Sequence, residues 1–431
     1  MQRFLLIYDV NGGSKVCRLE INGGKCLCGE IRVQGSKNSV LPILAATLLT
    51  DKECVIHNCP KISDTISAFK ILCGLGCRTQ FSDGTAVICA SDVNNCVIPS
   101  ELMKKMRSSV MFLGPILATK KEAVICRPGG CRLGERPIDI HINAFKKLGA
   151  EIYEDGECIT CQIDKVLSND ITLLYPSVGA TENIMLLCAG SNVEVKIINS
   201  AREPEIVDLQ NFLNKMGADI RGAGTDVIRI CPRCTLHGCD YKVMPDRIVS
   251  ATYGCAVAMC GGDVFLKEAE PEHLRVFTAV LEEMGCGVFV EENGIRVSSD
   301  KRILCMPSLK TLPYPGFPTD VQPVLTAALT VADGCSKINE TIFENRFGFT
   351  DELLKMGADI QKDGCSVLIQ GVDKLHGAEV TAADLRGGAA LVSAGLAADE
   401  KTIVNGIEFL DRGYENIEAV LSGVGADIRR T

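Results

Sequence analysis

The chain has little of what a nucleic-acid-binding protein needs. Its 431 residues include no tryptophan, 7 tyrosines and 14 phenylalanines, so side chains that could stack on bases are scarce. Its formal net charge is −9, which provides no general basic surface for a phosphate backbone. The composition therefore argues against a nucleic-acid partner, and an anionic ligand would need a local group of cations.

Long apolar segments are also missing. No run approaches the roughly 18 apolar residues of a membrane-spanning helix. The apolar run at residues 4–8 is shorter than the roughly 7–15 residues of a signal-peptide core, and no cleavage pattern follows it. We therefore expect no membrane insertion and a cytoplasmic location.

Histidine is scarce and cysteine is abundant. The chain has 5 histidines, and its CxxC pair at Cys231 and Cys234 has no second CxxC pair within the roughly 15–20 residues that separate the pairs of a zinc site, so we expect no metal. The 23 cysteines are a smaller fraction than the roughly 8–10% typical of short disulfide-rich proteins. We expect most of them to be buried, reduced thiols. Examples in apolar stretches are Cys73, Cys188, Cys255 and Cys260.

An internal repeat is the strongest architectural signal. Hydrophobic residues make up 46% of the chain, which is typical of a packed globular protein. Six glycines, 68 to 73 residues apart, each follow an amphipathic stretch and occupy the position of a helix-ending residue. They are Gly76, Gly149, Gly217, Gly285, Gly357 and Gly425.

Each repeat of about 70 residues contains a strand, a loop, a helix and a hairpin. Asp-Gly or Asn-Gly pairs, such as Asp155-Gly156, mark the hairpin turns. Alanine- and glycine-rich helices near residues 251–260 and 389–398 are apolar on all sides and should be central. The repeats divide three and three, with a break near residues 236–245, so we expect an α/β protein of two domains.

The loops before the capped helices carry unusual side chains. Arg202, Arg346 and Arg412 occupy equivalent loops, where a helix start and a cation together suit phosphate or carboxylate. Taken singly, each arginine is more simply a solvated surface charge. Cys131 differs from the other cysteines because its loop, RPGGCRLGERP, contains two neighbouring glycines and three arginines. Nearby positive charge lowers the pKa of a thiol, so we expect Cys131 to be reactive.

Ten motifs are spread along the chain from about residue 21 to the C-terminus. They are RVQGSKNSVLPILAATLL, KKMRSSVMFLGP, PGGCRLGERPIDIHI, SVGATENIM, AREPEIVDL, PDRI, FPTDVQ, ENRF, ADLRGGAALV and DRGYENIE. Together they resemble the UDP-N-acetylglucosamine 1-carboxyvinyltransferases of the enolpyruvyl transferase family. The resemblance implies transfer of the enolpyruvyl group of phosphoenolpyruvate to the 3-hydroxyl of UDP-N-acetylglucosamine with release of phosphate, the first committed step of peptidoglycan synthesis.

The resemblance also implies an architecture. The family fold consists of two inside-out α/β barrels of three repeats each, with the active site in the cleft between them. The domains would then be residues 37–244, and residues 21–36 plus 245–431. Residues 1–20 would be an extension without an assigned function. No cofactor, metal or oligomer is implied for the site, and the partners are the two small-molecule substrates.

The resemblance assigns roles to individual residues. Asp320 matches the general base, and Cys131 matches the cysteine that fosfomycin alkylates, with a role as acid or in product release. Asp384 and Arg386 match a pair that stabilises the closed cleft. Phosphoenolpyruvate would contact Lys37, Asn38, Arg136 and Arg412, and UDP-N-acetylglucosamine would contact Arg107, Pro137, Ile138, Asp139, Ile140, Ser177, Val178, Gly179, Asp320 and Ile342.

Two other functions stay open at this point. A sister enzyme that uses shikimate 3-phosphate shares the fold class, although PGGC and SVGATEN resemble the sugar-nucleotide enzyme. A non-catalytic binding protein built from repeats is the alternative of a different class.

Overall fold

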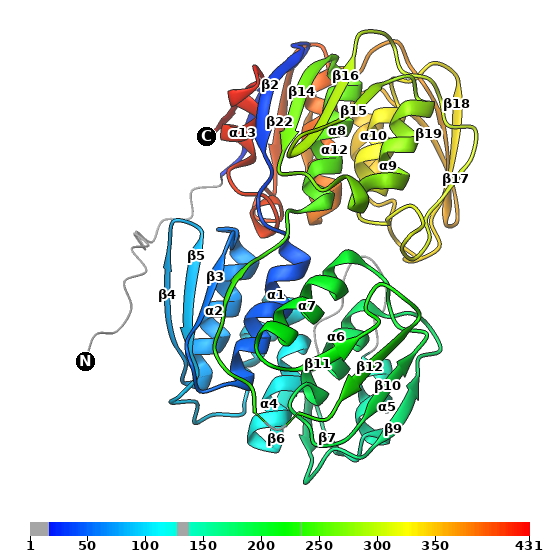
Figure 1. Ribbon diagram of the computed structural model, residues 1–431. Helices are drawn as coiled ribbons and strands as arrows, with labels where there is room; N and C mark the ends of the chain where they lie inside the picture. The colour runs from blue at the N-terminus through cyan, green and yellow to red at the C-terminus, as the bar shows by residue number, and fades with distance from the viewer. Residues whose placement is uncertain (1–16, 127–137, 234) are drawn as a thin grey trace. The chain divides into compact units, whose positions relative to one another are not determined.

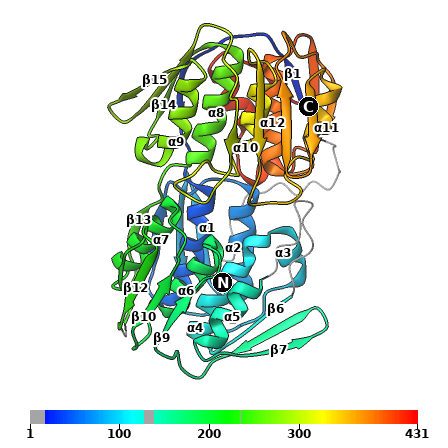
Figure 2. The same cartoon turned by 90° about the vertical axis from the view of Figure 1, so that its right-hand side faces the viewer.

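The computed structural model describes residues 17–126, 138–233 and 235–431. The chain divides into two compact units, and both combine helices with small sheets (Figures 1 and 2). One unit contains the described residues of 35–244, and the other contains residues 17–34 and 245–431. The α/β class and the two-domain organisation predicted from the repeats are therefore confirmed.

The described strands of the first unit form three separate sheets, ordered β13-β3-β5-β4, β6-β8-β7 and β9-β10-β12-β11. Helices α1 and α6 are buried along nearly their whole length. The strands are β3 (Cys54–His57), β4 (Arg78–Ser82), β5 (Thr85–Cys89), β6 (Glu122–Cys126), β7 (Glu151–Asp155), β8 (Cys158–Gln162), β9 (Asn169–Thr172), β10 (Val195–Ile198), β11 (Asp219–Arg221), β12 (Val227–Cys231) and β13 (Asp240–Lys242). The helices are α1 (Lys37–Ala46), α2 (Ser63–Leu75), α3 (Ser100–Lys105), α4 (Leu113–Lys120), α5 (Asp139–Lys147), α6 (Val178–Cys188) and α7 (Pro204–Lys215), with short 3-10 turns η1 (Thr47–Leu49) and η2 (Arg107–Phe112).

The second unit also contains three sheets, ordered β2-β14-β16-β15, β17-β18-β20-β19 and β21-β22-β1-β23. Helices α8, α10 and α12 pack on one another and are almost entirely buried. For α8 and α12, this burial was predicted from their alanine- and glycine-rich sequences. The strands are β1 (Leu19–Asn22), β2 (Leu27–Arg32), β14 (Gly262–Lys267), β15 (Gly287–Glu291), β16 (Gly294–Ser299), β17 (Leu309–Lys310), β18 (Cys335–Asn339), β19 (Asp359–Asp363), β20 (Ser366–Gln370), β21 (Glu379–Thr381), β22 (Lys401–Asn405) and β23 (Asp427–Arg430). The helices are α8 (Arg247–Cys260), α9 (Pro271–Glu283), α10 (Gln322–Leu329), α11 (Thr350–Lys355), α12 (Leu385–Ala397) and α13 (Ile417–Gly423), with the 3-10 turn η3 (Leu410–Arg412).

The six repeat glycines adopt the conformation predicted for them. All have φ between 86° and 107°, in the left-handed region that favours glycine, and they follow α2, α5, α7, α9, α11 and α13. A hairpin comes next along the chain after the first five glycines, as predicted, whereas Gly425 is followed only by β23, which pairs with β1. In the hairpin of β7 and β8, however, the turn residues are Gly156 and Glu157, one position later than the Asp-Gly pair, because Asp155 still pairs with Cys158. The repeat is therefore confirmed, with a small change in turn position.

The N-terminal segment belongs to the second unit. Strand β1 pairs with β22 and β23, and β2 pairs with β14. Strand β1 begins at Leu19 because Leu19 and Ile21 both face the core, so the extension expected at residues 1–20 overlaps the sheet by two residues. Glu20 forms ion pairs of 2.8 Å with Lys401 and Arg429, whose hydrogen bonds lower its pKa to about 2.

The expectation that most cysteines are buried is wrong. Of the 21 described cysteines, 7 are buried, 9 are half-buried and 5 are exposed. Cys188 and Cys255 are buried as expected, but Cys73 and Cys260 are half-buried. Strands explain part of the difference, because alternate side chains of a half-buried strand point outward, as at the exposed Cys28 of β2. Within the described ranges, no helix is long and apolar enough to cross a membrane.

Candidate active site

The predicted substrate residues are only partly covered by the structure. Cys131, Arg136 and Pro137 lie outside the described residues, as does the side chain of Arg107, which opens η2. The remaining predicted residues are contributed by both units.

Lys37 is the first residue of α1 and is buried. Its ammonium nitrogen Nζ lies 3.1 Å from Oδ2 of Asp64, which is in the first turn of α2. The chain reaches this position through Gly35, where a Cβ would lie 1.8 Å from the carbonyl oxygen of Asn58, so no larger residue fits. The ion pair fixes the position of the Lys37 ammonium group. Asp64 could not be identified from the sequence, because nothing in the sequence of α2 indicates that it pairs with Lys37.

Asp208 of α7 holds the start of α1 from a second direction. Its carboxylate accepts hydrogen bonds from the hydroxyl of Ser39, from the hydroxyl of Tyr241 at 2.6 Å and from the backbone N–H of Met244 at 3.2 Å. Burial raises the pKa of Asp208, while these three hydrogen bonds act in the opposite direction. The segment that contains Lys37 and Asn38 is therefore fixed by hydrogen bonds as well as by helix packing.

Helices α5 and α6 carry the residues predicted to contact the nucleotide. Ser177 caps α6, and its Oγ accepts a hydrogen bond of 3.3 Å from a backbone N–H. Asn183 of α6 donates from Nδ2 to Nδ1 of His141 at 2.9 Å, and His141 belongs to α5. A Cβ on Gly179 would lie 3.2 Å from that imidazole. Asn183 and His141 thus bring Asp139 and Ile140 close to the start of α6.

A buried carboxyl lies within the same helix. Glu182 is 1% exposed, and neither of its oxygens has a hydrogen-bond partner among the described residues. Burial raises the pKa of Glu182 well above its ordinary value, and the nearby carboxylates of Glu205 and Glu203 raise it further. Burial and the two neighbouring carboxylates therefore favour the protonated form of Glu182 in the folded protein.

The raised pKa of Glu182 makes the free energy of unfolding depend on pH. Between the pKa of Glu182 in the unfolded chain, about 4.3, and its higher folded value, the folded state binds more protons than the unfolded state, so stability falls as pH rises. Glu182→Gln, which resembles the protonated form, should be more stable than wild type at pH 8 and similar at pH 5 in urea unfolding. The exposed Glu53→Gln is the matched control, and an equal change at both pH values would contradict the prediction.

In the second unit, Asp320 is held by two arginines. Its Oδ1 accepts a hydrogen bond of 2.9 Å from Arg346, and its Oδ2 accepts one of 3.0 Å from Arg386. Both arginine side chains are less than 5% exposed, whereas Asp320 is 29% exposed. The two buried cations favour the ionised carboxylate and fix both of its oxygens. Arg346 lies in the ENRF motif, but nothing in the sequence marks it as the partner of Asp320.

Asp384 and Arg386 are linked through the backbone. The Oδ1 atom of Asp384 caps α12 by accepting hydrogen bonds from the backbone N–H groups of Arg386 and Gly387, at 3.0 and 3.1 Å. The Arg386 side chain extends to Asp320 instead. The backbone N–H of Ile342 donates to Oε1 of Glu340 at 2.8 Å, which fixes the backbone at the predicted contact.

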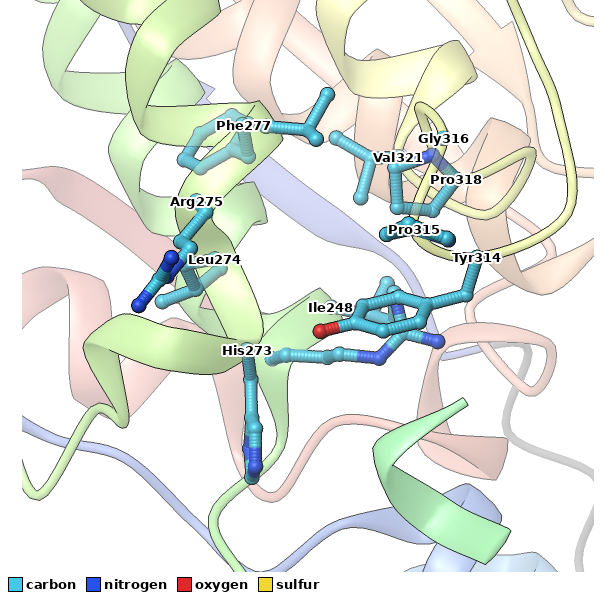
Figure 3. A pocket seen from close by; sticks show the side chains of 12 residues that line it. Ile248, His273, Leu274, Arg275, Phe277, Tyr314, Pro315, Gly316, Pro318 and Val321 are labelled. Atoms are coloured by element: carbon cyan, nitrogen blue, oxygen red, sulfur yellow. The ribbon is translucent and has the colours of Figure 1, made fainter. Parts of the chain in front are cut away.

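A pocket of about 230 Å³ lies near the starts of α8 and α9 (Figure 3). Apolar side chains such as Ile248 and Val321 form much of its wall, and the guanidinium carbon of Arg247 lies 5.5 Å from the centre of the Tyr314 ring. Val321 follows Asp320 directly, so the pocket borders the segment that carries the predicted base. None of its lining residues is a predicted substrate contact.

Known proteins with similar sequences define the class. The family model described as EPSP synthase (3-phosphoshikimate 1-carboxyvinyltransferase) matches residues 21–421. A protein of Caldanaerobacter subterraneus subsp. tengcongensis, named UDP-N-acetylglucosamine 1-carboxyvinyltransferase 2, is 50% identical over 96% of this chain and 99% of its own length. UDP-N-acetylglucosamine 1-carboxyvinyltransferase 1 of Carboxydothermus hydrogenoformans is 46% identical over 95% of this chain and 97% of its own.

Solved structures agree with the sequence comparisons. The enolpyruvyl transferase NikO from Streptomyces tendae is 25% identical, with a TM-score of 0.87, over 96% of this chain and 99% of its own. EPSP synthase from Acinetobacter baumannii, 17% identical, has the same fold, with a TM-score of 0.75 over 96% and 100% of the two chains. The chain belongs to the enolpyruvyl transferase family and, within it, to the UDP-N-acetylglucosamine 1-carboxyvinyltransferases.

Proposed function

We propose that this enzyme transfers the enolpyruvyl group of phosphoenolpyruvate to the 3-hydroxyl of UDP-N-acetylglucosamine and releases phosphate. The observation that carries the proposal is the near-full-length identity of 46 to 50% with relatives named for this activity. The ionised Asp320 between two buried arginines supports it, because the reaction needs a fixed proton acceptor. The step opens peptidoglycan synthesis, and we propose that it takes place in the cytoplasm.

The chemistry assigns a task to each group. The donor's methylene carbon takes up a proton and becomes a methyl group while the sugar oxygen attacks the adjacent carbon. The resulting tetrahedral adduct then loses phosphate from that carbon and a proton from the methyl group, which restores the double bond. Lys37, Asn38, Arg136 and Arg412 bind the donor's phosphate and carboxylate, which suit point charges and planar guanidinium groups. Asp320 accepts the proton of the sugar hydroxyl, because it is a carboxylate whose two oxygens are held in place by Arg346 and Arg386.

Cys131 serves as acid or in product release, and Asp384 and Arg386 stabilise the closed, liganded state. The UDP-N-acetylglucosamine contacts named above complete the proposed site. The hydrogen bond between Asn183 and His141 supports the part formed by α5 and α6.

We expect phosphate release from phosphoenolpyruvate to require UDP-N-acetylglucosamine, and we expect shikimate 3-phosphate not to replace it. The reason is that PGGC and SVGATEN resemble the sugar-nucleotide enzyme, and the relatives named for it are far more similar than the EPSP synthase of known structure. A phosphate-release assay with each acceptor tests this. Efficient turnover with shikimate 3-phosphate would support the sister activity, and no turnover with either acceptor would favour a binding protein.

A further inference from the structure

Two segments of the second unit that carry predicted sugar-nucleotide contacts meet at one buried carboxylate, Glu340. This residue follows β18 and is 3% exposed. Its Oε2 accepts a hydrogen bond of 2.9 Å from the hydroxyl of Thr319, which precedes Asp320. Its Oε1 accepts hydrogen bonds of 2.8 and 3.2 Å from the backbone N–H groups of Ile342 and Phe343. A single side chain therefore holds both segments.

Glu340 is itself attached to the sheet. Its Oε1 also accepts a hydrogen bond of 2.9 Å from the hydroxyl of Thr311, which is fully buried beside β17. The N–H of Thr311 donates to the carbonyl of Asn339, the last residue of β18, at 3.0 Å. The hydroxyl oxygen of Thr311 also accepts a bond of 2.9 Å from the N–H of Thr341. The carboxylate is thus fixed relative to β17 and β18 before it contacts the two loops.

Arg346 provides a second connection between the segment that contains Asp320 and the segment that follows Ile342. Arg346 donates to the carbonyl oxygen of Thr319 at 3.3 Å and to Oδ1 of Asp320 at 2.9 Å. The backbone that carries Asp320 is therefore held by Glu340 through Thr319 and by Arg346 directly. Catalytic geometry of this kind must be maintained within about 0.5 Å by supporting hydrogen bonds. Removing Glu340 would release the Asp320 segment and the Ile342 segment together.

We propose that Glu340 is a positioning residue that sets the orientation of Asp320 and of the Ile342 backbone toward the sugar nucleotide. It contacts neither reacting atom and acts through Thr319 and the 342–343 backbone. The inference rests on the proposed function, because that function makes Asp320 and Ile342 substrate contacts.

Glu340→Ala removes all four hydrogen bonds. We expect kcat/KM for UDP-N-acetylglucosamine to fall at least about tenfold, since misplacement by about 1 Å can cost a hundredfold. The KM for the sugar nucleotide should rise more than the KM for phosphoenolpyruvate, whose proposed contacts lie elsewhere. Glu340→Gln should stay within about threefold of wild type, because its oxygen can still accept from Ile342 and Phe343 and its NH2 group can donate to the Thr319 hydroxyl.

The matched control is Glu20→Ala, which removes another buried carboxylate of the same unit, paired with Lys401 and Arg429. It should lower the Tm without changing either KM. If Glu340→Ala yields no folded enzyme, Thr319→Val breaks only one of the four bonds and should lower kcat about threefold or more with little change in Tm.

Wild-type KM values in folded Glu340→Ala, no rescue in Glu340→Gln, or wild-type kinetics in Thr319→Val would overturn the inference. Its failure is distinguishable from failure of the proposed function. If the function is wrong, wild-type enzyme itself releases no phosphate with UDP-N-acetylglucosamine. If only the inference is wrong, wild-type enzyme is active and the Glu340 variants behave like the Glu20 control.

Discussion

Asp320→Asn should bind both substrates and turn them over at least about a hundredfold more slowly than wild type, since a positioned acid or base contributes about 10²–10⁴. Arg346 and Arg386 hold the two oxygens of Asp320 at 2.9 and 3.0 Å. Asparagine keeps the size of the side chain, but its amide cannot accept the proton of the sugar hydroxyl. The substitution also removes the negative charge that lies between the two arginines. Phosphate release gives kcat, and calorimetric titration gives the affinity for each substrate.

The loss of charge beside two buried arginines should also lower stability, so a control must separate the two effects. Glu20→Gln provides it, because Glu20 also forms ion pairs in the second unit, with Arg18, Lys401 and Arg429. The pKa of Glu20, about 2, means that its contribution to stability is lost as pH falls from about 4.3 toward 2. This variant should therefore be less stable than wild type at neutral pH, the difference should shrink as pH falls toward 2, and its turnover should be unchanged. Near-normal turnover in Asp320→Asn with intact binding would exclude a role for Asp320 as the base.

Fosfomycin should inactivate the enzyme by alkylating Cys131, and Cys131→Asp should abolish inactivation while retaining turnover. The thiolate opens the epoxide ring, forming a carbon–sulfur bond as a carbon–oxygen bond breaks. Three arginines near Cys131 in the sequence favour the thiolate and attract the anionic reagent. Burial raises the pKa of Cys77, Cys161 and Cys260 to about 12, so these thiols stay protonated at neutral pH.

One described cysteine is a real competitor for the reagent. Hydrogen bonds from Ser91, and then from Arg78, lower the pKa of Cys89. Cys89→Ser is therefore the matched control and should remain sensitive to fosfomycin. Peptide mass mapping after treatment should find the adduct on Cys131. An adduct on Cys89 alone, or inactivation that persists in Cys131→Asp, would show that the reactive residue has been misidentified.

The sequence determined the repeat, the fold class and the family. Helix ends are encoded locally, which is why Gly76 and its five equivalents could be predicted from an amphipathic stretch followed by glycine. The motifs are also contiguous, so candidate residues such as Lys37, Asp320 and Arg386 could be identified directly. Burial of the cysteines was predicted wrongly from the sequence. Side chains along a half-buried strand point alternately inward and outward, and cysteine can occupy either position.

Only the tertiary structure decided which side chains hold these candidates in place. Lys37 pairs with Asp64, Asp320 pairs with Arg346 as well as Arg386, and Ser39 bonds to Asp208, 169 positions away. In the sequence, nothing distinguishes Glu340 from any other residue that follows a strand. The structure shows that its carboxylate accepts four hydrogen bonds. The physical reason is that capping and periodicity depend on a few neighbouring residues, whereas an ion pair or a buried hydrogen bond depends on how separate helices and sheets pack.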